Sequence, residues 1–186
     1  GETAEEGDKK AAIEMLGEAK FRLVDAMVEE QNISFLAIGR PESAGCYCKV
    51  NAYLKEIISS IADNYDYVVI DGEAGIEQVN RRVMEEVTNL VLVSDASKKG
   101  LGVVRTIQMV AEELTMADNI GLIINRIPSA VDPGEIDTEG LKVLAMIGDD
   151  PGMAMADMRG DSAFSAEKDA PVVNGMRRAL EEMGIL

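Results

Sequence analysis

The sequence predicts an α/β fold, a mostly parallel β-sheet flanked by helices. Short apolar runs alternate with segments of helical periodicity, and no internal repeat or long linker interrupts them. Apolar residues make up 47% of the 186 residues, which is enough to build the core of one domain of ordinary size. Aromatic residues make up only 4%, so the core must be largely aliphatic. We therefore interpret residues 1–186 as a single domain.

The N-terminal half begins with a predicted helix, Asp8–Glu30, in which apolar residues recur at helical spacing. The continuous apolar run Ile33–Ile38 predicts a buried strand. Asn51–Ile61 carries its apolar residues on one face, as an amphipathic helix does. Asp66–Asp71 is the clearest strand, because it is rich in β-branched residues and is bounded by turn-forming residues.

The C-terminal half continues the alternation. Apolar runs predict strands at Leu90–Val93, Ile120–Ile124 and Val143–Ile147. Helical patterns predict helices at Asn80–Val87, Leu101–Leu114, Met153–Arg159 and Val172–Met183, with a loop or short helix at 129–141. Strands separated by helices pair in parallel through right-handed crossovers, and such sheets bind ligands beyond the carboxyl ends of their strands. Each motif discussed below lies at such an end.

The net charge of −16 opposes binding to nucleic acid, which requires a basic face, and to an anionic membrane surface. No apolar run approaches the roughly 20 residues of a membrane span, and we find no signal peptide. With only two cysteines, the chain fits a reducing compartment. We therefore expect a cytoplasmic protein with neither a nucleic acid nor a membrane as partner.

Cys46 and Cys48 are the only cysteines, and they lie one residue apart in a loop that contains Gly and Pro. Both sulfurs can bind one soft metal ion, and neighbouring Arg40 and Lys49 favour the thiolate form. Structural metal sites usually take four ligands, and the chain has no His. Carboxylates, water or the same pair from a second subunit would complete the set, and the last option suits a symmetric homodimer. The alternative is that both are small buried apolar residues.

Two further strand ends carry polar residues. Asp71, followed by glycines, can hold the hydration shell of Mg²⁺ beside a nucleotide, or it can simply cap a helix. Asn125 offers a donor and an acceptor, as the edge of a purine base requires, or it can form a turn.

Five segments resemble a known family: Gly39–Cys48, Asn64–Glu77, Val93–Asp95, Lys99–Leu101 and Ile123–Arg126. They are similar to the accessory ATPases that mature nickel carbon monoxide dehydrogenase, within the class of P-loop ATPases that includes nitrogenase iron proteins and MinD/ParA proteins. The resemblance implies a homodimer that uses ATP/ADP with Mg²⁺, has a nickel carbon monoxide dehydrogenase as its client, and holds Ni²⁺ or Zn²⁺ at Cys46 and Cys48. It implies a magnesium and γ-phosphate switch at Asp71, Glu73 and Gly75, and base binding at Asn125, Arg126, Gly148, Asp149 and Pro151.

One departure from this family is the absence of a Gly-rich loop ending in Lys-Ser/Thr. We therefore expect an N-terminally truncated domain that lacks the P-loop strand, with a vacant strand position beside residues 67–71. ATP hydrolysis follows from the resemblance alone. The leading hypothesis is an ATP-dependent metallochaperone for nickel insertion. The alternatives are a nucleotide-independent metal-binding or scaffold protein, and an iron–sulfur electron carrier similar to the nitrogenase reductase.

Overall fold

The computed structural model describes residues 17, 25–37, 58–72, 87–114, 117–138 and 140–186. The chain divides into two compact units, Gly1–Gly72 and Glu73–Leu186. The interpretation of the whole chain as a single domain stays a prediction.

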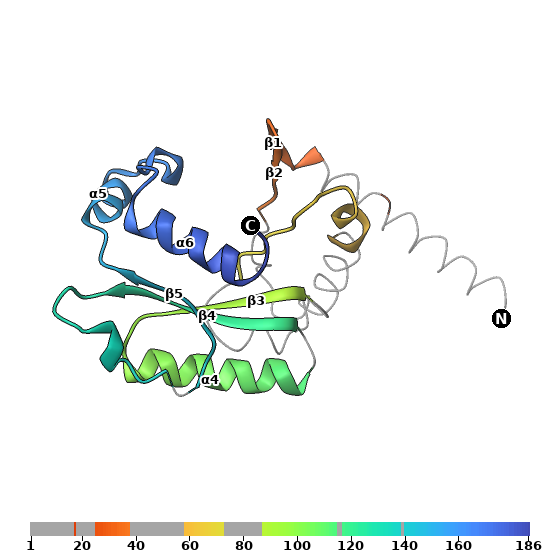
Figure 1. Cartoon of the computed structure of the whole chain (residues 1–186). Helices are drawn as coiled ribbons and strands as arrows, with labels where there is room; N and C mark the ends of the chain where they lie inside the picture. Colours follow the sequence, from red (N-terminus) through yellow and green to blue (C-terminus); the bar gives the residue numbers. More distant parts are fainter. Residues whose placement is uncertain (1–16, 18–24, 38–57, 73–86, 115–116, 139) are drawn as a thin grey trace, which may run out of the picture. The chain divides into compact units, whose positions relative to one another are not determined.

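The second unit is built on a parallel three-stranded sheet (Figure 1). Its strands are β3 (Val87–Ser94), β4 (Ala117–Ile127) and β5 (Val143–Gly148), with β4 in the centre. β3 pairs with β4, and β4 pairs with β5, each in parallel. The predicted α/β fold with a parallel sheet is therefore confirmed, and the three strands predicted in this half are all present.

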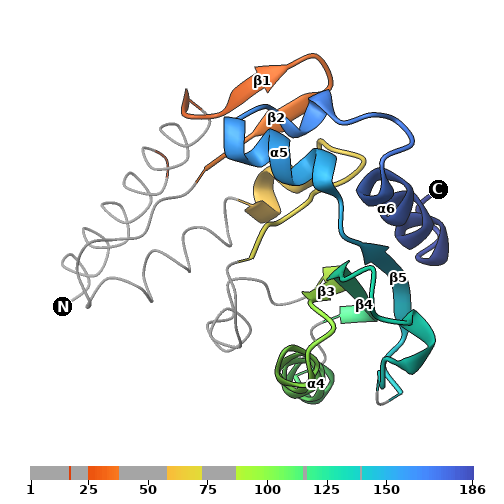
Figure 2. The same ribbon diagram turned by 90° about the vertical axis from the view of Figure 1, so that its left-hand side faces the viewer.

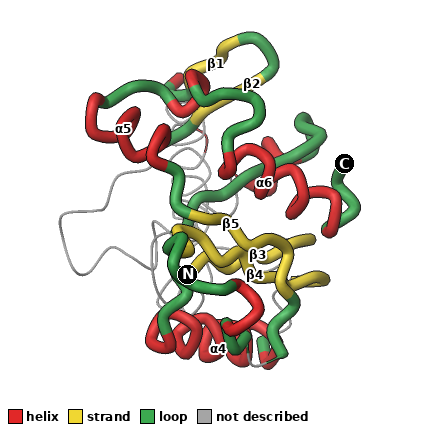
Figure 3. Tube along the Cα trace, turned by 60° about the vertical axis from the view of Figure 1, so that its left-hand side comes forward, coloured by secondary structure: helices red, strands yellow, loops and turns green. Residues whose placement is uncertain are grey.

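Helices cover both faces of this sheet, α4 (Lys98–Glu113) on one side and α6 (Pro171–Glu182) on the other (Figures 1 and 3). Alternation along β4 explains the two layers, because successive side chains of a strand point to opposite faces. Leu122 and Ile124 pack in the cluster that includes residues of α4, whereas Ile123 packs in the cluster that includes Ala179 of α6. These positions are buried aliphatic residues, as the composition predicts.

Helix α6 lies unusually close to β5 at Gly175. A Cβ added there would lie 2.6 Å from Ile147 Cδ1 and nearer still to Ile147 Cγ1, so only glycine fits without a shift of its neighbour. Within the sheet, a Cβ added at Gly121 of β4 would lie 2.6 Å from Leu144 Cδ1. Both glycines are therefore required by close packing.

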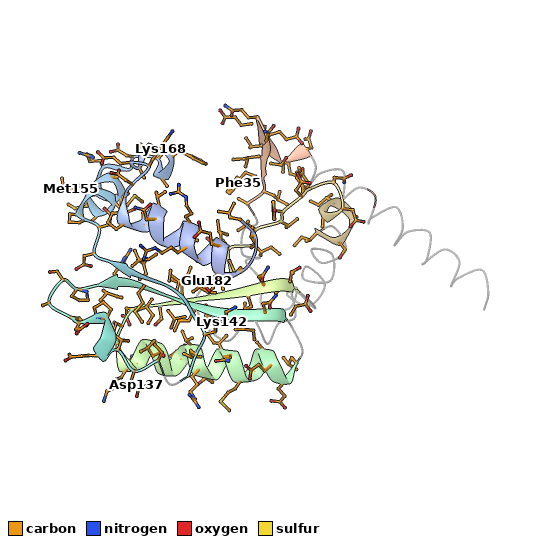
Figure 4. The ribbon with its side chains drawn as sticks, viewed as in Figure 1. Phe35, Asp137, Lys142, Met155, Lys168 and Glu182 are labelled. Carbon is orange, nitrogen blue, oxygen red and sulfur yellow. The ribbon has the colours of Figure 1, made fainter. Side chains whose placement is uncertain are left out.

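The connections beyond β4 and β5 are short helical turns. The 3₁₀ turn η1 (Pro133–Glu135) precedes β5, in agreement with the loop or short helix predicted there. After β5 come α5 (Pro151–Arg159) and the 3₁₀ turn η2 (Ala163–Ser165), both visible in Figure 2. Helix α5 buries none of its side chains, and Met155 on it is 51% exposed (Figure 4). Among the helices described, none is both long and apolar enough to span a membrane.

The first unit contains a hairpin where the sequence predicts the end of a helix and the start of a strand. β1 (Val28–Glu30) and β2 (Ile33–Phe35) pair antiparallel across a two-residue turn in which Gln31 has a φ of 54°. The predicted helix to Glu30 is therefore wrong at its C-terminal end. The strand predicted from Ile33 is present as β2, but its predicted burial is wrong, because it pairs locally and Phe35 is 63% exposed (Figure 4).

The segment 66–72 of this unit has no regular secondary structure and belongs to no strand of the described structure. The helical residues 58–62 precede it, and Asn64 and Tyr65 donate backbone hydrogen bonds to the last turn, as a helix end requires. Val69 is 93% exposed, so the predicted buried strand Asp66–Asp71 is wrong for this structure. A strand needs a partner for its backbone groups, and none of the described residues pairs here. The vacant strand position expected beside it stays a prediction, because β3 belongs to the other unit.

Candidate functional site

The carboxyl ends of β4 and β5 lie at one edge of the sheet, and several polar residues lie there. Ile127 near the end of β4 is paired with Gly148 at the end of β5, and the Asp149 backbone N–H donates to the Ile127 carbonyl oxygen at 3.0 Å. The five residues for which the sequence predicts base binding all lie on this edge: Asn125, Arg126, Gly148, Asp149 and Pro151. Parallel sheets bind ligands at this kind of edge. The structure therefore brings together the residues of one predicted subsite.

A bulge in β4 shapes this edge. Ile124 pairs with Met146 and Ile127 pairs with Gly148, so three steps along β4 match two steps along β5. The extra residue lets Ile124 and Ile127 both face the α4 core, with exposed fractions of 0% and 4%, although strict alternation would place them on opposite faces. Arg126 adopts a φ of 56°, which costs a residue other than glycine about 1–2 kcal/mol.

The Asn125 carboxamide is held by the neighbouring backbone. Its Oδ1 accepts a hydrogen bond from the Arg126 N–H at 2.9 Å. Within the part of the chain that the structure describes, Asn125 Nδ2 has no hydrogen-bond acceptor. A carboxamide oxygen has two lone pairs, so the group can still accept one bond and donate two.

Asp150 is a polar residue of this edge that the sequence analysis did not single out. Its Oδ1 accepts from the Met153 N–H at 3.0 Å and so caps the N-terminus of α5. Its Oδ2 is buried and has no hydrogen-bond partner. An Asp directly before a Pro is a helix-start signal, and that signal could have identified Asp150 as a residue with a fixed orientation.

Asn125 and Asp150 each keep one polar atom without a hydrogen-bond partner in the described structure, and these atoms are a donor and an acceptor. Adenine presents an amino group as donor and ring nitrogens as acceptors. Asn125 Nδ2 is a donor without a partner in the described structure, and Asp150 Oδ2 is a buried acceptor without one. A buried acceptor that lacks a donor destabilises a protein by about 1–3 kcal/mol, so Asp150 Oδ2 carries an unmet hydrogen-bond demand.

The polar groups that follow the end of β3 form hydrogen bonds with one another. Asp95 Oδ1 accepts from the Ser97 N–H at 3.0 Å and from Ser97 Oγ at 2.6 Å, and Ser97 Oγ in turn accepts from the Gly100 N–H at 3.0 Å. The side-chain hydrogen bond from Ser97, aided by that from its backbone, lowers the pKa of Asp95 below its ordinary value of 3.8. A Cβ added at Gly100 would lie 2.5 Å from Asp95 Oδ1. These groups cap α4, so they serve the fold.

The structure does not test the other predicted site residues against this edge. Asp71 is exposed and belongs to the first unit, whereas Asn125 belongs to the second. Cys46, Cys48, Glu73 and Gly75 lie outside the described residues. Where the structure describes side chains, no three of the Cys, Asp and Glu residues gather as metal ligands. The metal pair and the γ-phosphate switch therefore stay predictions.

The fold is that of the MinD proteins. The chain superposes on MinD of Pyrococcus horikoshii, solved as a complex with Mg-ADP, with a TM-score of 0.63 at 23% identity, covering 86% of this chain and 68% of that one. It superposes on MinD of Aquifex aeolicus with a TM-score of 0.66 at 17% identity, covering 87% and 70% of the two chains. This likeness establishes a MinD-like α/β fold.

Curated proteins are similar in sequence as well. An uncharacterised ATP-binding protein of Methanocaldococcus jannaschii is 37% identical over 118 residues, which are 63% of this chain and 47% of that protein. The carbon monoxide dehydrogenase accessory protein CooC of Rhodospirillum rubrum is 30% identical over 142 residues, 74% of this chain and 54% of that one. No family model matches. The chain spans about half the length of these two relatives and is distantly homologous to them.

Proposed function

We propose that this chain belongs to an ATP-binding metallochaperone that inserts nickel into carbon monoxide dehydrogenase. The observation that carries the nucleotide half is the pair of partnerless groups, Asn125 Nδ2 and Asp150 Oδ2, at the carboxyl edge of a MinD-like sheet. The relatives support it, since one is named as ATP-binding and another as a carbon monoxide dehydrogenase accessory protein.

In this proposal the base lies across the ends of β4 and β5. Asn125 Nδ2 donates to a ring nitrogen, and Asp150 Oδ2 accepts from the exocyclic amine. Arg126, Gly148, Asp149 and Pro151 line the same edge. Asp71, Glu73 and Gly75 hold the hydrated Mg²⁺ and respond to the γ-phosphate, so that hydrolysis changes how two subunits meet.

The cargo is one Ni²⁺ or Zn²⁺ ion held between two subunits of a cytoplasmic homodimer. Cys46 and Cys48 of each subunit supply four thiolates, a set that suits these metals. Release of the ion to the client enzyme follows when the loss of the γ-phosphate loosens the dimer.

Isothermal titration with MgATP tests the nucleotide half. The measurement uses the whole gene product as well as the 186-residue chain, because the curated relatives are about twice as long as the matched segment. Asn125→Asp replaces the donor by an acceptor and should weaken binding by about 10-fold or more, since an unpaired polar group costs about 1–3 kcal/mol.

Asn119→Asp is the matched control, because Asn119 lies on the same strand near its amino end. It should leave the dissociation constant unchanged. A whole gene product that binds no MgATP, or an Asn125→Asp variant that binds as wild type does, would overturn the proposed base site.

Native mass spectrometry tests the metal half. The wild type should carry one metal ion per dimer, and the Cys46→Ser/Cys48→Ser double variant should carry none. Metal retention by the double variant would exclude the cysteine pair as the site. A metal-loaded protein that shows no ATP adduct and no change of mass with ATP would support a nucleotide-independent scaffold. Visible iron–sulfur absorbance after anaerobic purification would support an electron carrier.

A further inference from the structure

Helix α5 carries a continuous apolar stripe on its outer face. Pro151, Ala154, Met155 and Met158 recur at the spacing i, i+3, i+4 and i+7, which places them on one side of a helix. A stripe of this kind normally faces a core, yet all four residues are exposed, and Met158 is 83% exposed. The partly buried residues of α5 lie on the other side of the helix. The core of the unit therefore does not account for the stripe.

Helix α5 is stabilised at both ends by local hydrogen bonds. Asp150 caps its first turn, and Pro151 stands at its first position. At the other end Gly160 adopts a φ of 71°, and the Asp161 N–H donates to the Ala156 carbonyl oxygen at 2.9 Å, as in a Schellman cap. None of the side chains of α5 is buried. The helix thus forms while its apolar stripe stays open to a partner.

The 3₁₀ turn η2 adds to this apolar surface. η2 and α5 contact each other (Figure 2). Phe164 of η2 is 89% exposed. A single exposed apolar residue is ordinary, but several large ones on contacting elements mark an interaction site. Together, the stripe of α5 and Phe164 form the α5 patch.

The segment that carries the α5 patch, residues 149–169, is acidic. It contains six acidic residues and two basic ones. Asp157 flanks the stripe on one side of the helix. Arg159 flanks it on the other, but its Nε donates to Asp161 Oδ2 at 2.9 Å, so its charge is already paired. The acidic residues are Asp149, Asp150, Asp157, Asp161, Glu167 and Asp169.

We propose that the α5 patch docks a segment of another protein in which an apolar stripe is flanked by Lys or Arg. The apolar side chains of that segment cover Met155, Met158 and Phe164, and its cations meet the surrounding carboxylates. Methionine suits such a surface, because its flexible side chain adapts to the partner. The same carboxylates disfavour other occupants, since two copies of the patch would bring like charges together and an anionic membrane would repel it.

Fluorescence anisotropy of a labelled peptide tests this assignment with the whole gene product. The probe is an amphipathic peptide of Leu and Lys, and the control peptide has Glu in place of Lys. The Leu/Lys peptide should bind, and the Leu/Glu peptide should bind at least about 10-fold more weakly. Added NaCl should weaken binding of the Leu/Lys peptide. Equal binding of the two peptides, or no binding of the Leu/Lys peptide, would overturn the proposal.

Two variants locate the bound peptide. Met158→Gln and Phe164→Ser change side chains that are already exposed, so the fold should be preserved. Each should weaken binding of the Leu/Lys peptide by about 10-fold. Met109→Gln is the matched control, because Met109 is 62% exposed on α4, and it should bind within about 2-fold of wild type. Equal affinities of the three variants would show that the peptide binds elsewhere and would overturn the proposal.

Two further outcomes would assign the α5 patch to another occupant and would equally overturn the proposal. One is self-association of the wild type that Met158→Gln abolishes, measured by sedimentation velocity. The other is binding to vesicles of phosphatidylcholine and phosphatidylglycerol that Met158→Gln abolishes. These measurements contain neither nucleotide nor added metal. The proposed function can therefore fail while this inference stands, and this inference can fail while the proposed function stands.

Discussion

Replacing Gly175 by Ala should fail to stabilise the second unit, although the same change in an exposed helix stabilises. Gly175 is the fifth residue of α6, and an added Cβ would lie 2.6 Å from Ile147 Cδ1. Ile147 is 3% exposed and cannot move into solvent. Gly102 is the fifth residue of α4, and an added Cβ would meet no atom within 4 Å. The two glycines therefore form a matched pair. They occupy the same position in their helices, and only Gly175 has a neighbouring side chain where the added methyl group would lie.

The magnitudes follow from two opposing terms. Ala is favoured over Gly inside a helix by about 0.8–1.0 kcal/mol, and this term applies to both positions. Overpacking a filled core costs about 1–3 kcal/mol, and this term applies only at Gly175. Gly102→Ala should therefore raise the free energy of unfolding by about 1 kcal/mol. Gly175→Ala should lie about 1–3 kcal/mol below Gly102→Ala.

Urea unfolding followed by circular dichroism measures both variants, with the slope m checked for constancy. Ile147→Val supplies the cross-check, since it costs about 0.5–1.5 kcal/mol in the wild type. The same change should cost less in the Gly175→Ala background, where the shorter side chain makes room for the added methyl group. A Gly175→Ala variant as stable as Gly102→Ala would show that α6 does not approach β5 this closely.

Three other predictions concern Asp95, Asp150 and Gly121. The pKa of Asp95 is lowered in the folded state, so its contribution to stability is complete above its unfolded value near 3.8 and is lost as the pH falls through the lower folded value. Asp95→Asn removes this contribution. The urea midpoint of the variant should therefore fall less than that of wild type as the pH is lowered from about pH 5 to about pH 3. Asp150→Ala should lower stability by about 0.5–2 kcal/mol through loss of the α5 cap. Asp150→Asn should keep the cap yet weaken MgATP binding, and unchanged titrations would remove Asp150 from the proposed base site. Gly121→Ala should destabilise by about 1–3 kcal/mol in the same urea assay because Leu144 fills the space. A neutral result there would contradict the β4–β5 packing.

The sheet of the second unit could be predicted because its signals are local. Runs such as Ile120–Ile124 and Val143–Ile147 are continuously apolar, and the amphipathic pattern of Leu101–Leu114 lies between strands. Burial on both faces of a parallel sheet produces such continuous runs.

The hairpin and the segment 66–71 could not be predicted correctly, because pairing is a property of two segments. Ile33–Phe35 has the composition of a buried strand, but its partner is the neighbouring Val28–Glu30. Tyr67–Ile70 has high β propensity, and propensity alone does not supply a partner.

The candidate site was partly predictable. Asn125 and the 148–151 turn follow from their place after apolar runs, whereas the bulge depends on how Ile124 and Ile127 both reach one core. Arg is not a residue that signals a left-handed backbone, so the sequence offers no local cue to the positive φ at Arg126.

The order β3–β4–β5 within the sheet is also the order along the chain. Each pairing therefore closes a loop of moderate length between consecutive strands, and among the described strands of this sheet none pairs with a distant segment. We expect the strands and α4 to assemble first and α6, which follows β5 in sequence, to dock late. Stopped-flow kinetics would show this as faster unfolding of Gly175→Ala with an unchanged refolding rate, and slower refolding would place α6 in the folding nucleus.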